Sequence, residues 1–319
     1  TMERTVQIKA MYGDQVSTLP RLPTTADDLL RAVAQETKAF NFSVFFDGHP
    51  IRSNKDLAVA YLNNKSEELM FEVKENPNPM TQMDEGVQGM YQDMLNKFKD
   101  LSTAEKAPEP LPLQNGVLSK ENLLMVINEL VDRAKAKLFE SGKKFIEKRQ
   151  ELYEVDEENY KAVVMQQVQF QEMLIVSTSA EVNHYYQLGP GVFDNSINVH
   201  SQDPDIRKAL ENMSIEGIQA SGEVPESLTK EKLKEVLEYS CEFITKYMEE
   251  HQNMNPMEVL VLKTREADEV MKKYSYDELE ISAAMNKFDL ENDSYFSEIR
   301  DRINQVTQKL FGYNPQSFQ

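Results

Sequence analysis

The spacing of apolar residues changes once along this chain, and that change limits the folds open to it. In the first 75 residues apolar side chains alternate with polar ones, the period-2 pattern of half-buried strands. From Leu118 onward they recur every three or four residues, as on the buried face of a helix. The sequence therefore predicts an α+β protein, with a small strand-containing domain followed by a mostly helical region.

The N-terminal pattern predicts the element order ββαββαβ. A turn is expected at Gly13-Asp14 and another at Asp47-Gly48, because these pairs favour tight turns. Thr25 and Ser53 are suitable N-caps for the two helices. The expected strands cover residues 5–10, 16–19, 42–46 and 69–73.

This order, with one main helix over one face of a mixed sheet, resembles the ubiquitin-like β-grasp fold. Two features resemble the Phox/Bem family of interaction domains more narrowly: Lys9 within VQIKAMY, and SNKDLAVAYL from Ser53 to Leu62 at a helix start. The resemblance covers residues 3–75 and implies an interaction domain over 1–79. The helical remainder resembles no family in this way.

Phox/Bem domains join front to back, with a strand lysine of one domain docking on an acidic loop of the next. That loop would be residues 46–56, with the sequence FDGHPIRSNKD. Its two acidic residues are accompanied by two basic ones, Arg52 and Lys55, so the loop is not acidic overall. The resemblance therefore implies only a basic strand face that recognises a partner by charge complementarity. A solvated lysine that merely protects a strand edge is the alternative. The expected partner-binding residues are Lys9, Arg4 and Arg21.

The charge of the chain narrows the choice of partners. Lys and Arg total 35 against 54 Asp and Glu, a net charge of -19, which disfavours nucleic acid and anionic lipid. Residues 1–79 hold 9 basic and 11 acidic groups, so the rest carries nearly all of the excess. This contrast supports a domain boundary near Pro77 and Pro79.

Residues 80–117 are expected to form a linker with one amphipathic helix. Proline-rich stretches bound it, NPNPM from Asn76 and APEPLPLQNG from Ala107. The methionine-rich stripe of the helix either binds the groove of a partner or folds back on its own protein. The candidate recognition stripe consists of Met83, Val87, Met90, Tyr91, Met94 and Phe98.

The sequence of the helical region predicts two helical units, 118–213 and 227–319, that pack together as a bundle or short solenoid. The start of the first, LSKE from Leu118, recurs in the second as LTKE from Leu228. Each combines a Ser or Thr cap with an acid in the first turn. Chance similarity between capped, leucine-rich helices is the alternative to a true repeat.

Other features set the expected helix ends and further similarities. The first helix is expected to end near Ser141-Gly142, because glycine favours helix termination. The segment from Asp156 is faintly similar to the one from Ser275. Leu188-Gly189 compares with Phe311-Gly312, each expected to stop a long helix.

Motifs that carry chemistry are few. Glu181 and His184 lie one helical turn apart, but the second such pair that a di-iron bundle needs is missing. The acidic run from Asp289 lacks the glycine and closing glutamate of a calcium loop. There is no glycine-rich phosphate loop and no Gly-x-Ser-x-Gly motif. We expect no catalytic residue, no metal and no cofactor, hence not an enzyme.

The expected setting is the cytoplasm. The single Cys241 cannot form an internal disulfide, no basic and apolar leader precedes the first strand, and no apolar run approaches about 20 residues. The expected function is a non-catalytic adaptor or scaffold that binds other proteins, without membrane insertion and with self-association left open. The alternatives are a ubiquitin-like chaperone or quality-control cofactor, and a structural subunit of a cytoskeletal or ciliary assembly.

Overall fold

The computed structural model describes residues 5–9, 16–19, 21–37, 42–64, 68–76, 78–251 and 254–311. The chain divides into two compact units, called here the N-terminal unit (residues 1–81 with 88–103) and the helical unit (82–87 with 104–319). The segment expected as a linker, 80–117, is divided between them. The α+β class predicted from the sequence is confirmed.

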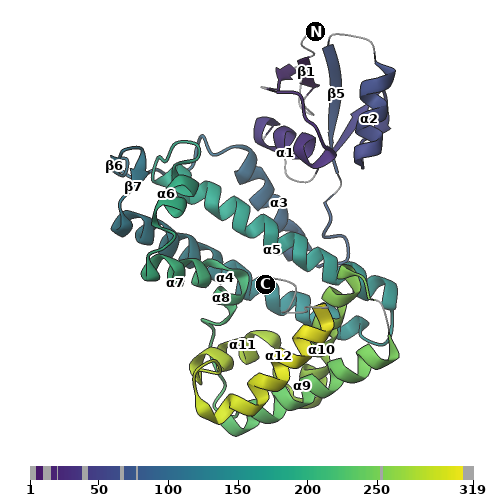
Figure 1. The fold of residues 1–319 in the computed structure, drawn as a ribbon, viewed down its shortest axis with the longest axis vertical. Coiled ribbons are helices and arrows are strands. Elements are labelled where there is room, and N and C mark those ends of the chain that lie inside the picture. The colour runs from purple at the N-terminus through teal and green to yellow at the C-terminus, as the bar shows by residue number, and fades with distance from the viewer. Residues whose placement is uncertain are drawn as a thin grey trace, which may run out of the picture. The chain divides into compact units, whose positions relative to one another are not determined.

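The N-terminal unit contains a five-stranded mixed sheet with the strand order β2-β1-β5-β3-β4 (Figure 1). β1 and β5 run parallel in it, and the other neighbouring strands are antiparallel. The order ββαββαβ and the β-grasp arrangement are as predicted. The elements are β1 (Thr5–Lys9), β2 (Val16–Thr18), α1 (Ala26–Thr37), β3 (Phe42–Phe46), β4 (His49–Pro50), α2 (Asn54–Asn63) and β5 (Glu68–Glu75).

Local signals in the sequence set these boundaries. The Thr25 hydroxyl accepts the backbone N–H at the start of α1 at 3.0 Å, and Ser53 does the same for α2 at 3.3 Å. Asp47 and Gly48 have φ of 47° and 76°, the left-handed pair of a two-residue hairpin. The turn expected at Gly13-Asp14 lies outside the described residues.

The core of the N-terminal unit lies between the sheet and its two helices. Alternate strand residues such as Ile8 and Phe71 are fully buried there, with Leu29 of α1 and Leu57 of α2 against them. Because strand side chains alternate, the residues between them lie on the opposite face of the sheet.

After the sheet come α3 (Glu85–Lys99) and a short hairpin of β6 (Leu113–Gln114) and β7 (Val117–Leu118). The hairpin was not predicted, because its proline-rich approach indicated extended chain. Asn115 and Gly116 form its turn, with φ of 52° and 80°. The Ala107 N–H donates to the Tyr185 carbonyl at 2.8 Å, so the second proline-rich stretch is hydrogen-bonded within the helical unit.

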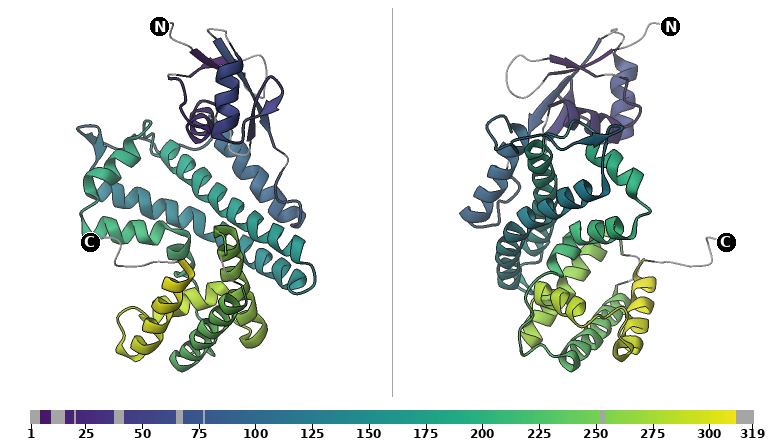
Figure 2. Two further views of the ribbon diagram at one scale, coloured as in Figure 1. Left: turned by 45° about the vertical axis from the view of Figure 1, so that its right-hand side comes forward. Right: turned by 90° about the vertical axis from the view of Figure 1, so that its left-hand side faces the viewer.

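The helical unit is built around the long antiparallel pair α4 and α5, which lie side by side (Figures 1 and 2). The helices from α9 to α12, drawn green to yellow, form a second group (Figure 2). The elements are α4 (Lys120–Leu152), α5 (Glu157–Tyr185), α6 (Val192–His200), α7 (Pro204–Met213), α8 (Ile215–Gln219), α9 (Lys230–Glu250), α10 (Pro256–Tyr274), α11 (Glu278–Lys287), the 3-10 helix η1 (Ser294–Phe296) and α12 (Ser297–Phe311).

The predicted helix end at Ser141-Gly142 is wrong, because α4 continues through both residues. The Ser141 hydroxyl donates to the Lys137 carbonyl at 2.7 Å, within the helix. Gly142 is buried, and a Cβ there would lie 3.4 Å from Leu279 of α11. The glycine thus marks a close approach of two helices and not a terminus.

The starts of α4 and α9, which are similar in sequence, also make similar contacts. Lys120, at the start of α4, lies 2.8 Å from the carboxylate of Asp203, which caps α7. Lys230, at the start of α9, contacts the carboxylate of Asp293, which caps η1. In each case two buried apolar side chains, three residues apart, come after the capping aspartate in the sequence. They are Ile206 and Ala209 after Asp203, and Phe296 and Ile299 after Asp293.

The end of α5 has a different counterpart from the one expected. Leu188 N–H donates to the carbonyl of Asn183, five residues back, at 2.8 Å, and Leu290 N–H donates likewise to Met285 at 2.9 Å. A residue with positive φ precedes each leucine. The structural match of the α5 end is therefore the α11 end. Of the pair expected at Phe311-Gly312, the glycine lies outside the described residues.

Candidate functional site

The face of the sheet away from α1 and α2, called here the outer sheet face, is the first candidate site. Its side chains are the members of each strand that alternate with the buried ones. Charged and apolar residues are mixed on it. Its central members are Lys9, Val16, Phe45, Met70, Glu72 and Lys74.

Lys9, the predicted docking residue, is exposed on this face. The strand register places it opposite Val16 on β2 and opposite Glu72 on β5. The Lys74 ammonium lies 3.7 Å from the Glu72 carboxylate and 4.7 Å from the centre of the Phe45 ring. Acidic and basic groups therefore alternate around Lys9, and the face is mixed in charge.

The other two predicted docking residues do not join Lys9 in the described structure. Arg4 lies outside the described residues. Arg21 is exposed, but its guanidinium is hydrogen-bonded to Asp28 of α1, the helix that covers the other side of the sheet.

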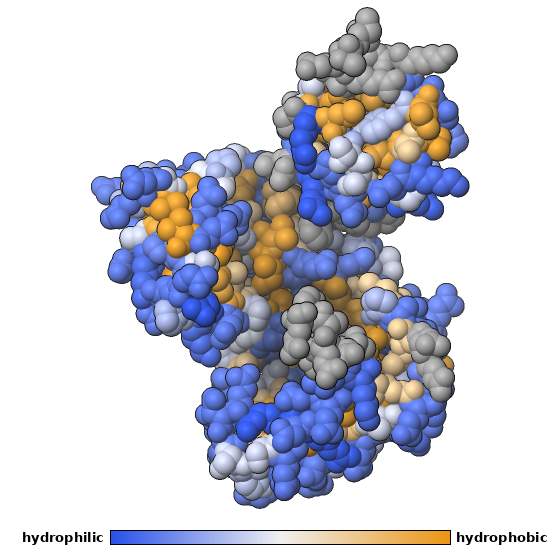
Figure 3. Space-filling view, viewed as in Figure 1, coloured by the Kyte–Doolittle hydropathy of each residue, from blue (hydrophilic) through white to orange (hydrophobic). Residues whose placement is uncertain are grey.

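Two apolar side chains of the outer sheet face are exposed: Val16, opposite Lys9, and Met70, opposite Gln7. Val16 is 47% exposed and Met70 is 37% exposed. Apolar residues are visible on the surface of the N-terminal unit in Figure 3 as well. Exposed apolar side chains among charged ones are compatible with a protein–protein contact surface.

The candidate recognition stripe of α3 is not an exposed surface. Met83, Val87, Tyr91 and Met94 are buried, while Met90 and Phe98 are half-buried. The segment before the helix is also held: Asp84 lies 3.0 Å from Lys144 of α4. The stripe thus serves packing in this structure, the second of the two predicted roles.

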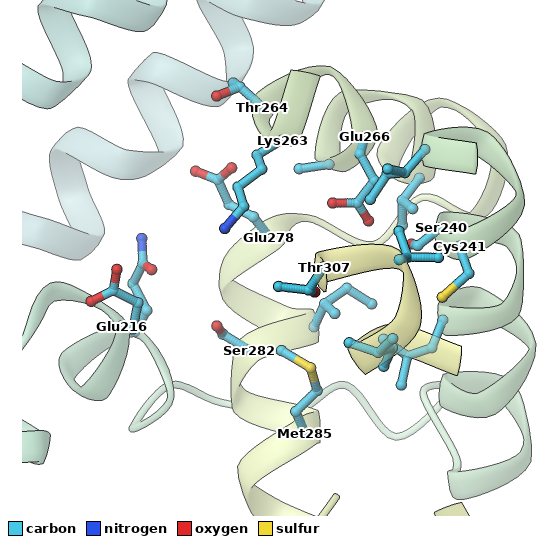
Figure 4. A pocket seen from close by; sticks show the side chains of 18 of the residues that line it. Glu216, Ser240, Cys241, Lys263, Thr264, Glu266, Glu278, Ser282, Met285 and Thr307 are labelled. Carbon is cyan, nitrogen blue, oxygen red and sulfur yellow. The ribbon is translucent and has the colours of Figure 1, made fainter. Parts of the chain in front are cut away.

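A cavity of about 530 Å³ in the helical unit is the second candidate site (Figure 4). Side chains from α5 and from α8 to α12 line it. Most of the exposed area of its wall is apolar, and about half of the lining residues carry polar or charged groups. Figure 4 shows Glu266, Ser240 and Cys241 together on one side, and Lys263 with Glu278 on another. No pattern in the sequence indicated this cavity, because its residues come from six separate helices.

A buried ion cluster supports one wall of the cavity. Arg149 of α4 is 1% exposed and lies 3.0 Å from Asp268 of α10 and 2.9 Å from Glu278 of α11. Tyr160 of α5 donates to Asp268 at 2.6 Å. Burial opposes the charge of Arg149, but the two carboxylates outweigh it, so its pKa is raised. Four helices are therefore joined through one guanidinium.

Glu266 is a half-buried carboxyl in the wall of this cavity. Burial raises the pKa of its carboxyl, and the nearby Glu278 carboxylate acts in the same direction. A hydrogen bond from Ser240 and the charge of Lys263 oppose this shift without cancelling it. A carboxyl with a raised pKa in a cavity is a common feature of binding sites.

The residues considered for metal binding, and the single cysteine, lie in the helical unit. Glu181 and His184 lie near the end of α5, and the described residues contain no group of three or more His, Cys, Asp or Glu that could hold a metal ion. Cys241 is buried in the cavity wall, where burial raises the pKa of its thiol.

Comparison with known proteins adds no family. No family model matches the chain, and neither a curated protein nor a solved structure is significantly similar to it. Among the residues that the structure describes, no helix is both long and apolar enough to span a bilayer.

Proposed function

We propose that this protein is a non-catalytic adaptor whose N-terminal unit binds a partner protein through the outer sheet face. The observation that supports this most is that the exposed Lys9 shares this face with two exposed apolar side chains, Val16 opposite it and Met70 opposite Gln7. Burying such apolar area provides the main favourable free energy of association, and a charged neighbour gives specificity.

The composition of the face indicates the chemistry of the partner. The exposed charges of this face include two lysines, Lys9 and Lys74, and two glutamates, Glu68 and Glu72. Because these charges balance, the face has no net charge that would attract a partner by electrostatics alone. The partner surface should have an apolar centre for Met70 and a carboxylate for Lys9. The resemblance of VQIKAMY to a Phox/Bem strand supports the same role for the lysine.

Charge reversal in the full-length chain tests this proposal. Lys9→Glu should lower the captured amount of a specific partner about tenfold or more, because it places a like charge against the partner's carboxylate. Arg31→Glu, the same charge change on α1, should leave capture unchanged. Added salt should weaken the wild-type contact only in part, since apolar burial is not screened. Equal capture by both variants would show that the outer sheet face is not the contact.

A further inference from the structure

The cavity of the helical unit has the size of a small-molecule site. At about 530 Å³ it falls in the range of roughly 300–1,000 Å³ that is typical of ligand pockets. It lies inside one compact unit, so its walls come from a single packed body.

Apolar atoms make up most of the exposed area of the cavity wall, although about half of the lining residues are polar. The aliphatic side chains come from several helices and suit the hydrocarbon part of a ligand. The apolar lining includes Leu237, Ile244, Val270, Ile281, Ile303 and Val306.

The charged groups of the lining are unequal in sign. Three carboxylates, those of Glu216, Glu266 and Glu278, face the cavity with one ammonium, that of Lys263. Glu278 already has a counter-ion, since its carboxylate lies 2.9 Å from buried Arg149. Glu216 is exposed to solvent, whereas Glu266 is half-buried, accepts a hydrogen bond from the neutral Ser240 hydroxyl and has the Lys263 ammonium as its nearby positive charge. Glu266 is thus the carboxylate with the most to gain from an added cation.

The sign of the lining excludes most other ligand classes. An anionic ligand would meet three carboxylates, and a neutral apolar one would remove water from Glu266 without supplying a partner, which is unfavourable. An ammonium group would donate a charge-assisted hydrogen bond to that carboxylate, the stronger kind of hydrogen bond. Burial raises the pKa of Glu266, and a nearby ammonium would favour the charged form of that carboxyl.

We infer that this cavity binds a small amphipathic cation, an amine on an apolar body, with Glu266 as the counter-ion and the aliphatic wall around the body. The inference is independent of the docking role of the N-terminal unit. It assigns the helical unit a ligand, so that the chain has a small-molecule site as well as a protein-binding face.

Three probes of one size test the inference by calorimetry on the full-length chain at pH 7.5: 4-phenylbutylamine, 4-phenylbutanol and 4-phenylbutyrate. We expect the amine to bind at least about tenfold more tightly than the other two, because only it pairs with Glu266. Glu266→Gln should lower the affinity for the amine to that for the alcohol, and leave the affinity for the alcohol unchanged.

Two further variants separate this site from general attraction to an acidic protein. Glu238→Gln removes one carboxylate from the exposed side of α9, outside the cavity lining, and should leave amine binding unchanged. Ala267→Leu fills part of the cavity and should abolish binding of every probe. Circular dichroism confirms that each variant is folded. The inference is wrong if the alcohol or the acid binds as tightly as the amine, if Glu266→Gln leaves amine affinity unchanged, or if no probe binds at millimolar concentration.

Discussion

At the scale of single residues, Arg149 is a fully buried charged group that contacts side chains of three other helices. Taking a guanidinium out of water is costly, and only well-placed carboxylates offset that cost. Here Asp268 and Glu278 supply them, from two helices that follow more than a hundred residues later in the chain.

Arg149→Met should therefore destabilise the protein by about 3–5 kcal/mol, because it leaves the Asp268 carboxylate buried without its partner. Chemical denaturation of the full-length chain measures this. Arg302→Met is the matched control: its partner Glu242 lies at 3.6 Å in an exposed pair, so the loss should stay below about 1 kcal/mol. Equal losses would mean that the buried cluster is not a determinant of stability.

Glu266 should make stability depend on pH. Since its folded pKa is raised above the ordinary value of 4.5, the folded state keeps a proton that the unfolded state has lost. Stability from this group therefore falls as pH rises above about 4.5, towards the folded pKa. Glu266→Gln should melt higher than wild type at pH 8 and at the same temperature at pH 4. A variant that melts lower at pH 8 would contradict the assignment.

Sequence patterns predicted which single residues are exposed or buried, but not which distant residues they pair with. The alternation of β1 predicted that Lys9 is exposed, which the structure shows. Arg149 stands three and four residues after Ile146 and Phe145 on an apolar helix face, so its burial had a local sign. Its partner Asp268 had to come from a distant helix, and no spacing within one helix reveals such a pair.

At the scale of helices, two glycines have opposite roles. Gly142 lies inside α4, where an added Cβ would make an ordinary contact with Leu279. Gly217 lies in α8, where an added Cβ would overlap the carbonyl oxygen of Glu211. Only the second glycine is required by its surroundings.

Gly142→Ala should stabilise the protein by about 0.5–1 kcal/mol, because alanine loses less conformational entropy in a helix. Gly217→Ala should destabilise it, since the backbone of the preceding residues must move. Denaturation midpoints of the two variants, compared with wild type, check both signs. If Gly142→Ala destabilises by more than about 1 kcal/mol, the tight packing of α4 on α11 is the stronger effect.

The same elements show where sequence patterns mislead. Ser141-Gly142 indicated a helix end, yet tertiary packing against Leu279 carries α4 through it. The prolines before Asn115-Gly116 obscured a hairpin whose turn residues are typical of such turns. Helix caps were predicted well, because Thr25, Ser53 and Ser119 act on their own first turn.

At the scale of the whole molecule, the two units determine where the chain can be cut. Composition alone favours cleavage at residues 107–116, but the amides of Ala107 and Leu111 are hydrogen-bonded to the end of α5. Residues 102–106 are exposed and precede that anchored stretch. Limited digestion of the full-length chain with a nonspecific protease should give its first cut at 100–106. A first cut within 107–116 would show that the anchored stretch is not stably packed.

The sequence supported the division into a sheet-containing part and a helical part, since the change in hydrophobic period and the change in charge both fall near Pro79. It could not supply the boundaries of the compact units. Residues 82–87 belong with the helical unit because Gln82 and Asp84 contact side chains of α5 and α4. Such contacts follow from three-dimensional packing and leave no local pattern.

The most direct test of the proposed function is hydroxyl-radical footprinting of the full-length chain with and without a captured partner. Exposed methionines oxidise rapidly, so Met70 reports on the outer sheet face, while Met125 and Met257, 40% and 44% exposed in the helical unit, serve as internal references. Docking through the outer sheet face predicts that the partner slows oxidation of Met70 several-fold and leaves Met125 and Met257 unchanged. Unchanged oxidation of Met70, with protection of either reference methionine, would contradict it.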